Sequence, residues 1–278
     1  MNFHKASQAV AVAALAAATV LSLAVVAFII VFVLERGLPQ LSAEFLFGLP
    51  RNMGKAGGIF PAIVGTFVLS LMAIGIALPL GVGTAVYLSE YTRETGLTRA
   101  IRFGTDCLAG IPSIIFGLFG YVFFVTTLRM GWSLIAGALT LAIMVLPTLI
   151  RTSEEAIRAV PASWREVSLS VGATKWDTVR KVVLPNALPG IVTGVMLSLG
   201  RSIGETAAVI FTAGSSFRLP KGVFDSVRTM AVHFYILARE GVSVEKAYGT
   251  AAVLVLSVLA VNVLTYWLMN RLIKRKAR

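Results

Sequence analysis

The chain has 278 residues, of which 57% are hydrophobic and 14% are charged, and its mean hydropathy is +0.84. Soluble domains are about 45–50% apolar and about 25% charged, so this composition excludes an ordinary soluble domain and indicates a protein embedded in a bilayer. The formal net charge of +12 would by itself suit a nucleic-acid partner. The basic residues, however, lie in short segments beside apolar runs, where lysine and arginine set membrane orientation. We therefore expect contact with membrane lipid and no nucleic-acid partner.

Six apolar segments are long enough for membrane-spanning helices, which need about 20 residues. The first, from Ala9 to Leu34, contains no charge and is too long for the apolar core of a cleaved signal peptide. The predicted spans cover residues 9–34, 60–87, 108–128, 134–150, 188–213 and 243–270. The sequence therefore predicts an all-α polytopic membrane protein with a single transmembrane domain, residues 1–278.

Two of the polar segments between the predicted spans have helical character. Residues 88–107 mix charged and apolar side chains and suit a short helix on the membrane surface. Residues 214–242 form an extended loop, whose second half is too short and too closely flanked by charge to span the bilayer. We expect a re-entrant or interfacial helix there. Ser243 is an N-cap candidate for the last span, with Glu245 in its first turn.

Lysine and arginine are unevenly distributed between the two sets of loops. With the N-terminus inside, the inner segments are 1–8, 88–107, 151–187 and 270–278, and they hold more of these residues than the outer segments do. The positive-inside rule then places both termini in the cytoplasm. We call residues 151–187 the cytoplasmic loop, and we predict that the loop 214–242 is extracytoplasmic.

The cytoplasmic loop is the longest polar passage, and three helix-start signals occur in it. In each, a Ser or Thr precedes an acidic residue by three positions, so that their side chains can satisfy free backbone N–H groups. The pairs are Thr152 with Glu155, Ser163 with Glu166, and Thr174 with Asp177. Pro161 separates the first two predicted helices, and Gly172 suits the left-handed turn that ends the second. We expect short helices joined by tight turns.

The middle helix of this loop has apolar residues at Trp164, Val167, Leu169 and Val171. They could insert into a groove on a partner protein. The same helix could instead be an amphipathic connector that lies on the bilayer. Both interpretations stay open on the residues alone.

Arg201 and Glu205 are the only ionisable residues deep inside a predicted span. A charge at the bilayer centre costs about 2.5–3.5 kcal/mol on insertion scales, so such residues mostly face protein or a polar pathway. Their spacing of four places them on one helix face, where they can partly neutralise each other. Gly190, Gly194 and Gly204 on the same stripe predict close packing against another helix. The pair is either a buried ion pair that fixes helix packing or a pathway cation for an oxyanion, with Glu205 competing for the guanidinium.

The sequence contains no pattern typical of catalysis or metal binding. The single cysteine, Cys107, has no partner for an internal disulfide, and no Cys/His pair has the spacing of a metal site. Residues 48–55 superficially match a phosphate-binding loop, but the spacing is one residue too long and Ala56 replaces the required Ser or Thr. We predict neither an ATP site nor an enzymatic activity in this chain.

Glu166, Gly172, Val182, Leu184 and Pro185 together resemble the EAA loop of bacterial ABC-transporter permease subunits. The two residues after the glutamate depart from the pattern, because they are Val and Ser where the loop usually has two alanines. In that family the loop docks into a cleft of the ATPase subunit. The resemblance therefore implies a type I ABC importer permease fold and a role in ATPase coupling for these five residues.

A narrower resemblance covers nearly the whole chain. Segments similar to the phosphate-specific (Pst) permeases, and most of all to the PstA-type subunit, are GGIFPAIVGT (57–66), YLSEY (87–91), LAGIPSIIFGLFG (108–120), RTSEEAIRAVP (151–161), GRSIGETAA (200–208) and VRTMAVHFYILAREG (227–241). This resemblance implies a permease that moves inorganic phosphate across the bacterial cytoplasmic membrane. It implies an ABC ATPase dimer that binds the ATP, a second, PstC-like permease and an extracytoplasmic phosphate-binding protein as partners. It implies no cofactor on this chain.

Two other functions fit parts of the pattern. A permease for sulfate or molybdate would carry the same features, because an arginine does not distinguish one oxyanion from another. An ion-coupled secondary transporter would be expected to show paired internal repeats, and the sequence shows none. We therefore expect a phosphate permease, with a permease for another oxyanion as the nearest alternative.

Overall fold

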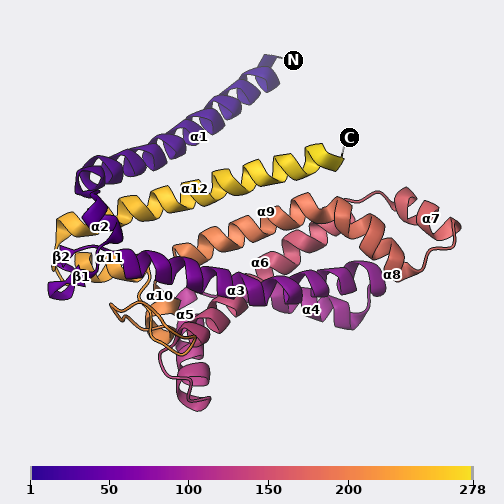
Figure 1. The fold of residues 1–278 in the computed structure, drawn as a ribbon. Helices are drawn as coiled ribbons and strands as arrows, with labels where there is room; N and C mark the ends of the chain where they lie inside the picture. Colours follow the sequence, from indigo (N-terminus) through magenta and orange to yellow (C-terminus); the bar gives the residue numbers. More distant parts are fainter. Residues whose placement is uncertain (1, 277–278) are drawn as a thin grey trace.

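The computed structural model describes residues 2–276, so Met1, Ala277 and Arg278 of the predicted domain and basic tail lie outside the described residues. Helices dominate, which confirms the predicted all-α class. The long helices are α1 (Asn2–Gly37), α3 (Phe60–Val86), α6 (Leu134–Arg158), α9 (Leu184–Ile203) and α12 (Val244–Lys276) (Figure 1). The shorter ones are α2 (Ala43–Phe47), α4 (Gly96–Ala109), α5 (Ser113–Gly120), α7 (Ala162–Ser170), α8 (Lys175–Thr178), α10 (Ala207–Thr212) and α11 (Met230–Arg239).

Tight turns and a small hairpin complete the described chain. The 3-10 helices are η1 (Leu38–Gln40) and η2 (Asn52–Gly54), and the π-helical turns are η3 (Tyr87–Tyr91), η4 (Tyr121–Thr127) and η5 (Val179–Val183). The strands β1 (Pro50–Arg51) and β2 (Ala56–Gly57) pair antiparallel. Residues 50–51 of the segment 48–55 form β1, and residues 52–55 form the turn between the two strands. The segment is therefore part of a hairpin and not the strand-to-helix loop that cradles phosphate.

Five stretches of the described chain are long and apolar enough to cross a membrane, and a sixth is broken. The five are Val10–Gln40, Phe60–Tyr91, Leu134–Arg158, Lys175–Ile203 and Val244–Trp267. In the sixth, α4 and the run Ser113–Thr127 are bent by 100° to each other. The straight third span predicted over residues 108–128 is therefore wrong at its start. Pro112 lacks an N–H and disfavours the helical conformation of the residue before it, which favours a break between α4 and α5 at this point.

The predicted fifth span, residues 188–213, is also divided differently in the structure. Helical structure starts earlier, at Lys175, and runs through α8, η5 and α9 to Ile203. The chain then leaves the helix and begins the short helix α10 at Ala207. Pro185 cannot donate a backbone hydrogen bond to the residue four positions before it. The π-helical turn η5 lies directly before Leu184 and Pro185, so the helical path continues past the proline with a local irregularity and does not stop there.

The main core of the bundle lies between α3 and α6, which pack against each other. Leu69 and Ala77 of α3 belong with Leu141 of α6 to one buried apolar cluster. Glycine brings the two backbones close: a Cβ added to Gly81 would lie 2.9 Å from the Cβ of Leu149. Small residues at helix contacts give the close packing that stabilises helix pairs in a membrane, where water supplies little driving force.

A second core joins the helix ends on the side of the cytoplasmic loop. Its buried residues are Ala85, Val86, Ile157, Val160, Val179, Val183, Ala187 and Ile191, which come from α3, α6, η5, α9 and the turn after α6. Gly190 and Gly194 of α9 lie against Ala156 and Thr152 of α6, which confirms the predicted close packing for these two glycines. The prediction is wrong for Gly204, because a Cβ added there would have only the carbonyl oxygens of Gly200 and Arg201 within 4 Å and no atom of another helix.

The two ends of the bundle carry different elements. Figure 1 shows α7 at one end, together with the start of α1 and the end of α12, whereas α2, the hairpin and α11 lie at the opposite end. The short helix expected in the second half of the loop 214–242 is α11, which packs against α12 and α3. Ser243 caps α12 as predicted, because its Oγ accepts a hydrogen bond from the Lys246 N–H at 3.3 Å.

Candidate functional site

One of the three helix starts predicted for the cytoplasmic loop is present in the structure. Thr174 is the N-cap of α8, and its Oγ1 accepts a hydrogen bond from the Asp177 N–H at 3.1 Å, as predicted. The other two predicted starts are wrong. Thr152 lies inside α6, and Ser163 lies in the first turn of α7, whose N-cap is Pro161. Buried residues continue along α6 past Thr152, so packing extends that helix beyond the local capping signal.

Gly172 forms the turn between α7 and α8. Its φ is +84°, which confirms the predicted left-handed conformation. An added Cβ would meet no atom within 4 Å, so backbone conformation and not packing requires glycine here.

The five residues predicted for ATPase coupling lie in three places along the loop. Glu166 is exposed on α7, and Gly172 is exposed at the turn that follows. Val182 belongs to η5, and Leu184 and Pro185 begin α9. These last three residues are half-buried where the loop rejoins the bundle. The first two residues of the motif are therefore accessible, whereas the last three lie partly within the bundle.

Apolar side chains are exposed along α7 and just after it. Trp164, Val167, Leu169, Val171 and Trp176 are all exposed, Val171 at 79% of its full accessible area. No residue of α7 is buried. A concentration of exposed apolar side chains marks an interaction site in a protein or at a membrane. We call these five residues the coupling surface.

Arg165, which the sequence reasoning missed, holds α7 to the bundle. Its Nε and Nη2 donate to Glu90 Oε1 at 2.9 and 2.7 Å. Its Nη1 donates to the Val160 carbonyl at 2.6 Å and its Nη2 to the Ile157 carbonyl at 2.8 Å. Glu90 lies 75 residues earlier, in η3, so no local pattern could have found the pair.

A second set of ion pairs holds α4 against α6. Arg102 of α4 pairs with Glu154 of α6 at 2.9 Å. Arg158, also in α6, pairs with the same carboxylate at 2.8 Å. Asp106 pairs with Arg151 at 3.1 Å, with both side chains more than half exposed. The surface helix predicted within residues 88–107 is thus fixed to the bundle end that carries the cytoplasmic loop.

Arg201 and Glu205 do not form the ion pair that their spacing predicts. α9 ends at Ile203, so the two residues do not share one continuous helix. Glu205 Oε1 instead accepts a hydrogen bond from the Ala208 N–H at 3.2 Å, at the start of α10. Arg201 is exposed, and within residues 2–276 no carboxylate pairs with it. The alternative of a buried ion pair that fixes helix packing is therefore wrong for this conformation.

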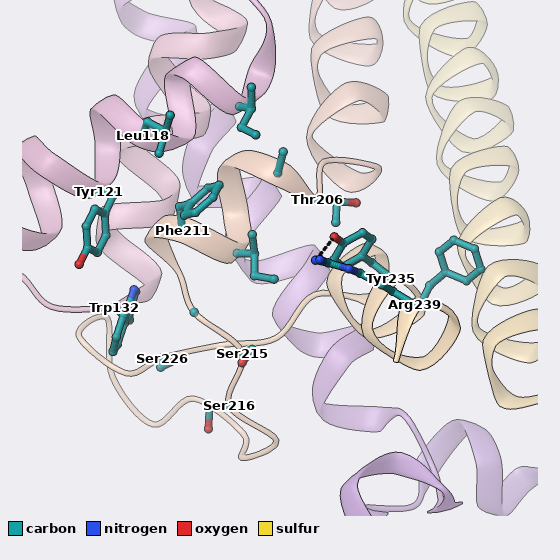
Figure 2. A pocket seen from close by; sticks show the side chains of 15 residues that line it. Leu118, Tyr121, Trp132, Thr206, Phe211, Ser215, Ser216, Ser226, Tyr235 and Arg239 are labelled. Carbon is teal, nitrogen blue, oxygen red and sulfur yellow. Dashed lines mark hydrogen bonds between the residues drawn. The ribbon is translucent and has the colours of Figure 1, made fainter. Parts of the chain in front are cut away.

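A cavity of about 1190 Å³ opens beside the break between α9 and α10, in which Glu205 lies. Figure 2 shows Thr206, Tyr235 and Arg239 on one side of it and Tyr121 and Trp132 on the other. The Arg239 guanidinium donates from Nη1 to the Tyr235 hydroxyl at 2.6 Å. Most of the lining is apolar and aromatic, with serine hydroxyls from the loop 214–242 along one edge. We call this cavity the outer groove.

A buried cation lies within the loop 214–242. Arg228 is 7% exposed; its Nε donates to the Ser215 carbonyl at 3.0 Å, and its guanidinium stacks over the Phe217 ring. Its Nη1 lies 3.4 Å from Nδ1 of His233, which is also buried. Burial, assisted by the charge of Arg228, lowers the pKa of His233 to about 4. His233 is therefore neutral at pH 7, with Nδ1 as the acceptor.

Residues 77–278 match the family described as the binding-protein-dependent transport system inner membrane component. The chain belongs to this family. The matched region includes the cytoplasmic loop, Arg201 and the outer groove. This membership confirms the predicted resemblance to ABC-transporter permeases, and the chain is a multi-pass inner membrane component of such an importer.

Two curated members of the family are similar over most of the chain. The probable ABC transporter permease protein YqgI of Bacillus subtilis is 35% identical over 260 residues, which cover 88% of each chain. The phosphate transport system permease protein PstA 1 of Mycobacterium tuberculosis is 38% identical over 211 residues, which cover 74% of this chain and 69% of that one. Several PstA proteins are thus among the relatives of this permease.

A solved structure shares the fold of this permease. A chain in the crystal structure of a bacterial alginate ABC transporter, in complex with its alginate pentasaccharide-bound periplasmic protein, superposes with a TM-score of 0.64. The likeness covers 95% of each chain at 15% identity, so it concerns the fold alone. It confirms the predicted type I ABC importer permease fold.

Proposed function

We propose that this permease moves inorganic phosphate across the membrane and that Arg201 is the cation that phosphate meets. The observation that carries the proposal is the Arg201 guanidinium: it is exposed and unpaired with a carboxylate among the described residues, while Glu205 is turned toward α10. A guanidinium offers a planar fork of donors that matches two oxygens of an oxyanion. The sequence identity with PstA proteins supports phosphate as that oxyanion.

In this proposal Glu205 competes with phosphate for Arg201. A site that held phosphate permanently would not release it, so the cation needs a competitor when the pathway changes state. In the present conformation the Glu205 carboxylate bonds the Ala208 N–H and leaves Arg201 available. Rejoining of α9 and α10 into one helix would bring Glu205 back within reach of Arg201 and displace the anion.

The energy for transport comes, in this proposal, from a separate ABC ATPase dimer. The coupling surface docks into a cleft of that dimer, with Glu166 and Gly172 at the contact and with Val182, Leu184 and Pro185 at the base of α9. ATP is bound by the partner, and this chain binds no cofactor. The exposed apolar side chains of α7 support docking over a mere connector, since α7 lies at an end of the bundle and buries none of them.

Two further partners complete the proposed importer. A second, PstC-like permease covers the outer groove, whose aromatic lining is exposed in the single chain. An extracytoplasmic phosphate-binding protein delivers the anion to the end that carries α2, α11 and the loop 214–242. Both termini are then cytoplasmic, because α1 starts and α12 ends at the same end of the bundle as α7 (Figure 1).

The test is phosphate uptake into membrane vesicles that contain the whole complex, with and without ATP and the binding protein. We expect uptake that needs both and that excess sulfate does not reduce. Equal competition by sulfate or molybdate would point to a permease for another oxyanion. Uptake without ATP would contradict an ATP-driven importer and favour an ion-coupled transporter.

A further inference from the structure

The coupling helix α7 has two side-chain links to the rest of the described chain, and they lead in different directions. Ser168 Oγ lies 2.9 Å from Thr178 Oγ1, which joins α7 to α8 and, through η5, to α9. Arg165 joins α7 to Glu90 in η3, at the end of α3. Since no residue of α7 is buried, these polar links and the turns at its ends set its position.

Arg165 is a rigid connection. Its planar guanidinium makes four hydrogen bonds at once, two to the Glu90 carboxylate and one each to the carbonyls of Ile157 and Val160. Ile157 lies in the last turn of α6 and Val160 in the turn that follows, where a cation also complements the helix dipole. One side chain thus ties α7 to both α6 and α3. Arginine suits this role because its donors lie in one fixed plane.

The Glu90–Arg165 pair is more shielded from water than an ordinary surface ion pair. The Glu90 side chain is only 8% exposed and that of Arg165 is 21% exposed. A charge pair that is shielded from water is screened less by salt than an exposed one. The neighbouring Leu88 is buried, so η3 cannot easily move away from the bundle. The second core, which includes Ala85 and Val86 of α3, lies next along the same helix.

We propose that Glu90 and Arg165 are positioning residues that transmit movement of α7 to α3, in parallel with the path through η5 to α9. The inference rests on the proposed docking of α7 to the ATPase. A push on α7 then moves the two helices that flank α6 together, and does not act on α9 alone. α3 is the helix that packs most extensively on α6, so the pair couples the ATPase to the core of the permease.

The test compares Glu90→Gln with Asp106→Asn in the complete complex in vesicles. Both changes replace a carboxylate by an amide of the same size and break an inter-helix ion pair, but Asp106 pairs with Arg151 at the exposed contact between α4 and α6. The readouts are phosphate uptake, ATP hydrolysis and the amount of ATPase that purifies with the permease. Glu90→Asp, which keeps the carboxylate, is the conservative variant.

We expect Glu90→Gln to keep the ATPase bound and to lower the phosphate moved per ATP hydrolysed by about threefold or more, a typical effect for residues that couple two sites. Glu90→Asp should lose less, and Asp106→Asn should match the wild type. An unchanged ratio in Glu90→Gln would overturn the inference, as would loss of the ATPase from the complex, which would show a role in assembly alone. The wild type separates the two proposals: if it shows no ATP-driven phosphate uptake, the proposed function fails, whatever the variants do.

Discussion

Thr152 of α6 lies directly against Gly194 of α9, so close that a Cβ at position 194 would overlap its hydroxyl. The two residues belong to the helices that enter and leave the cytoplasmic loop. Their contact therefore joins both sides of the loop before the chain reaches Arg201. A movement of α7 and α8 must therefore shift α6 and α9 together.

Replacing Gly194 by Ala should destabilise the permease by about 1–3 kcal/mol, because an extra methyl group in a packed contact forces side chains or backbone to shift. Gly200 is the matched control in the same helix, since nothing lies within 4 Å of an added Cβ there. Gly200→Ala should be neutral or stabilising by up to about 1 kcal/mol, because alanine favours a helix over glycine. Thermal unfolding of the purified permease in detergent measures both, and equal behaviour of the two variants would contradict the packing argument.

Gly172 should tolerate Asn better than Val. Its positive φ costs an ordinary residue about 1–2 kcal/mol, whereas Asn adopts this conformation more readily. No atom lies within 4 Å of a Cβ added at this position, so the difference comes from the backbone. We expect Gly172→Val to displace α8 relative to α7, and so to reduce ATPase binding or the phosphate moved per ATP, while Gly172→Asn stays closer to the wild type. Co-purification of the ATPase and uptake in vesicles provide the measurements. Identical coupling in the Val variant would argue against a docking role for this turn.

Replacing Arg201 by Gln should abolish phosphate uptake, or reduce it by at least about tenfold, since each hydrogen bond to a charged group contributes about 1.5–3 kcal/mol. The complex should still assemble, because Arg201 forms no ion pair within the described residues. Arg99→Gln, at an exposed arginine of α4, is the control for loss of one positive charge. Normal uptake in Arg201→Gln would rule out the proposed role.

His233 should make the stability of the permease depend on pH in the acid range. Its pKa is about 4 in the folded chain and about 6.5 when unfolded, so between these values the unfolded state binds more protons. Its contribution to stability is present above pH 6.5 and is lost as the pH falls toward 4, by at most about 1.4 kcal/mol per pH unit.

The control for this pH dependence is His233→Gln, which keeps an acceptor toward Arg228 but does not titrate in this range. The unfolding temperature of the wild type should fall more between pH 7 and pH 5 than that of the Gln variant. Parallel curves would show that His233 is accessible to protons in the folded state. Arg228 stays charged throughout, since burial lowers its pKa only to about 10.

Local sequence decided the features that depend on neighbouring residues. Apolar runs located the spans, because a bilayer requires about 20 apolar residues wherever the chain crosses it. Gly172, Thr174 and Ser243 were identified by their own turn and capping chemistry, and the structure has each in the predicted role. The sequence also identifies the apolar positions of α7, but it does not decide whether they contact a partner protein or the bilayer.

Tertiary structure alone decided which side chains meet. Arg201 and Glu205 have the spacing of a helical ion pair, but the helix ends between them and Glu205 bonds the next helix instead. Thr152 carries a capping signal, yet packing along α6 extends the helix past it. Arg165 donates hydrogen bonds to Glu90, which lies 75 residues earlier in the sequence. Spacing predicts contacts only within one regular element, whereas contacts between helices depend on how the whole bundle packs, and no short pattern encodes that.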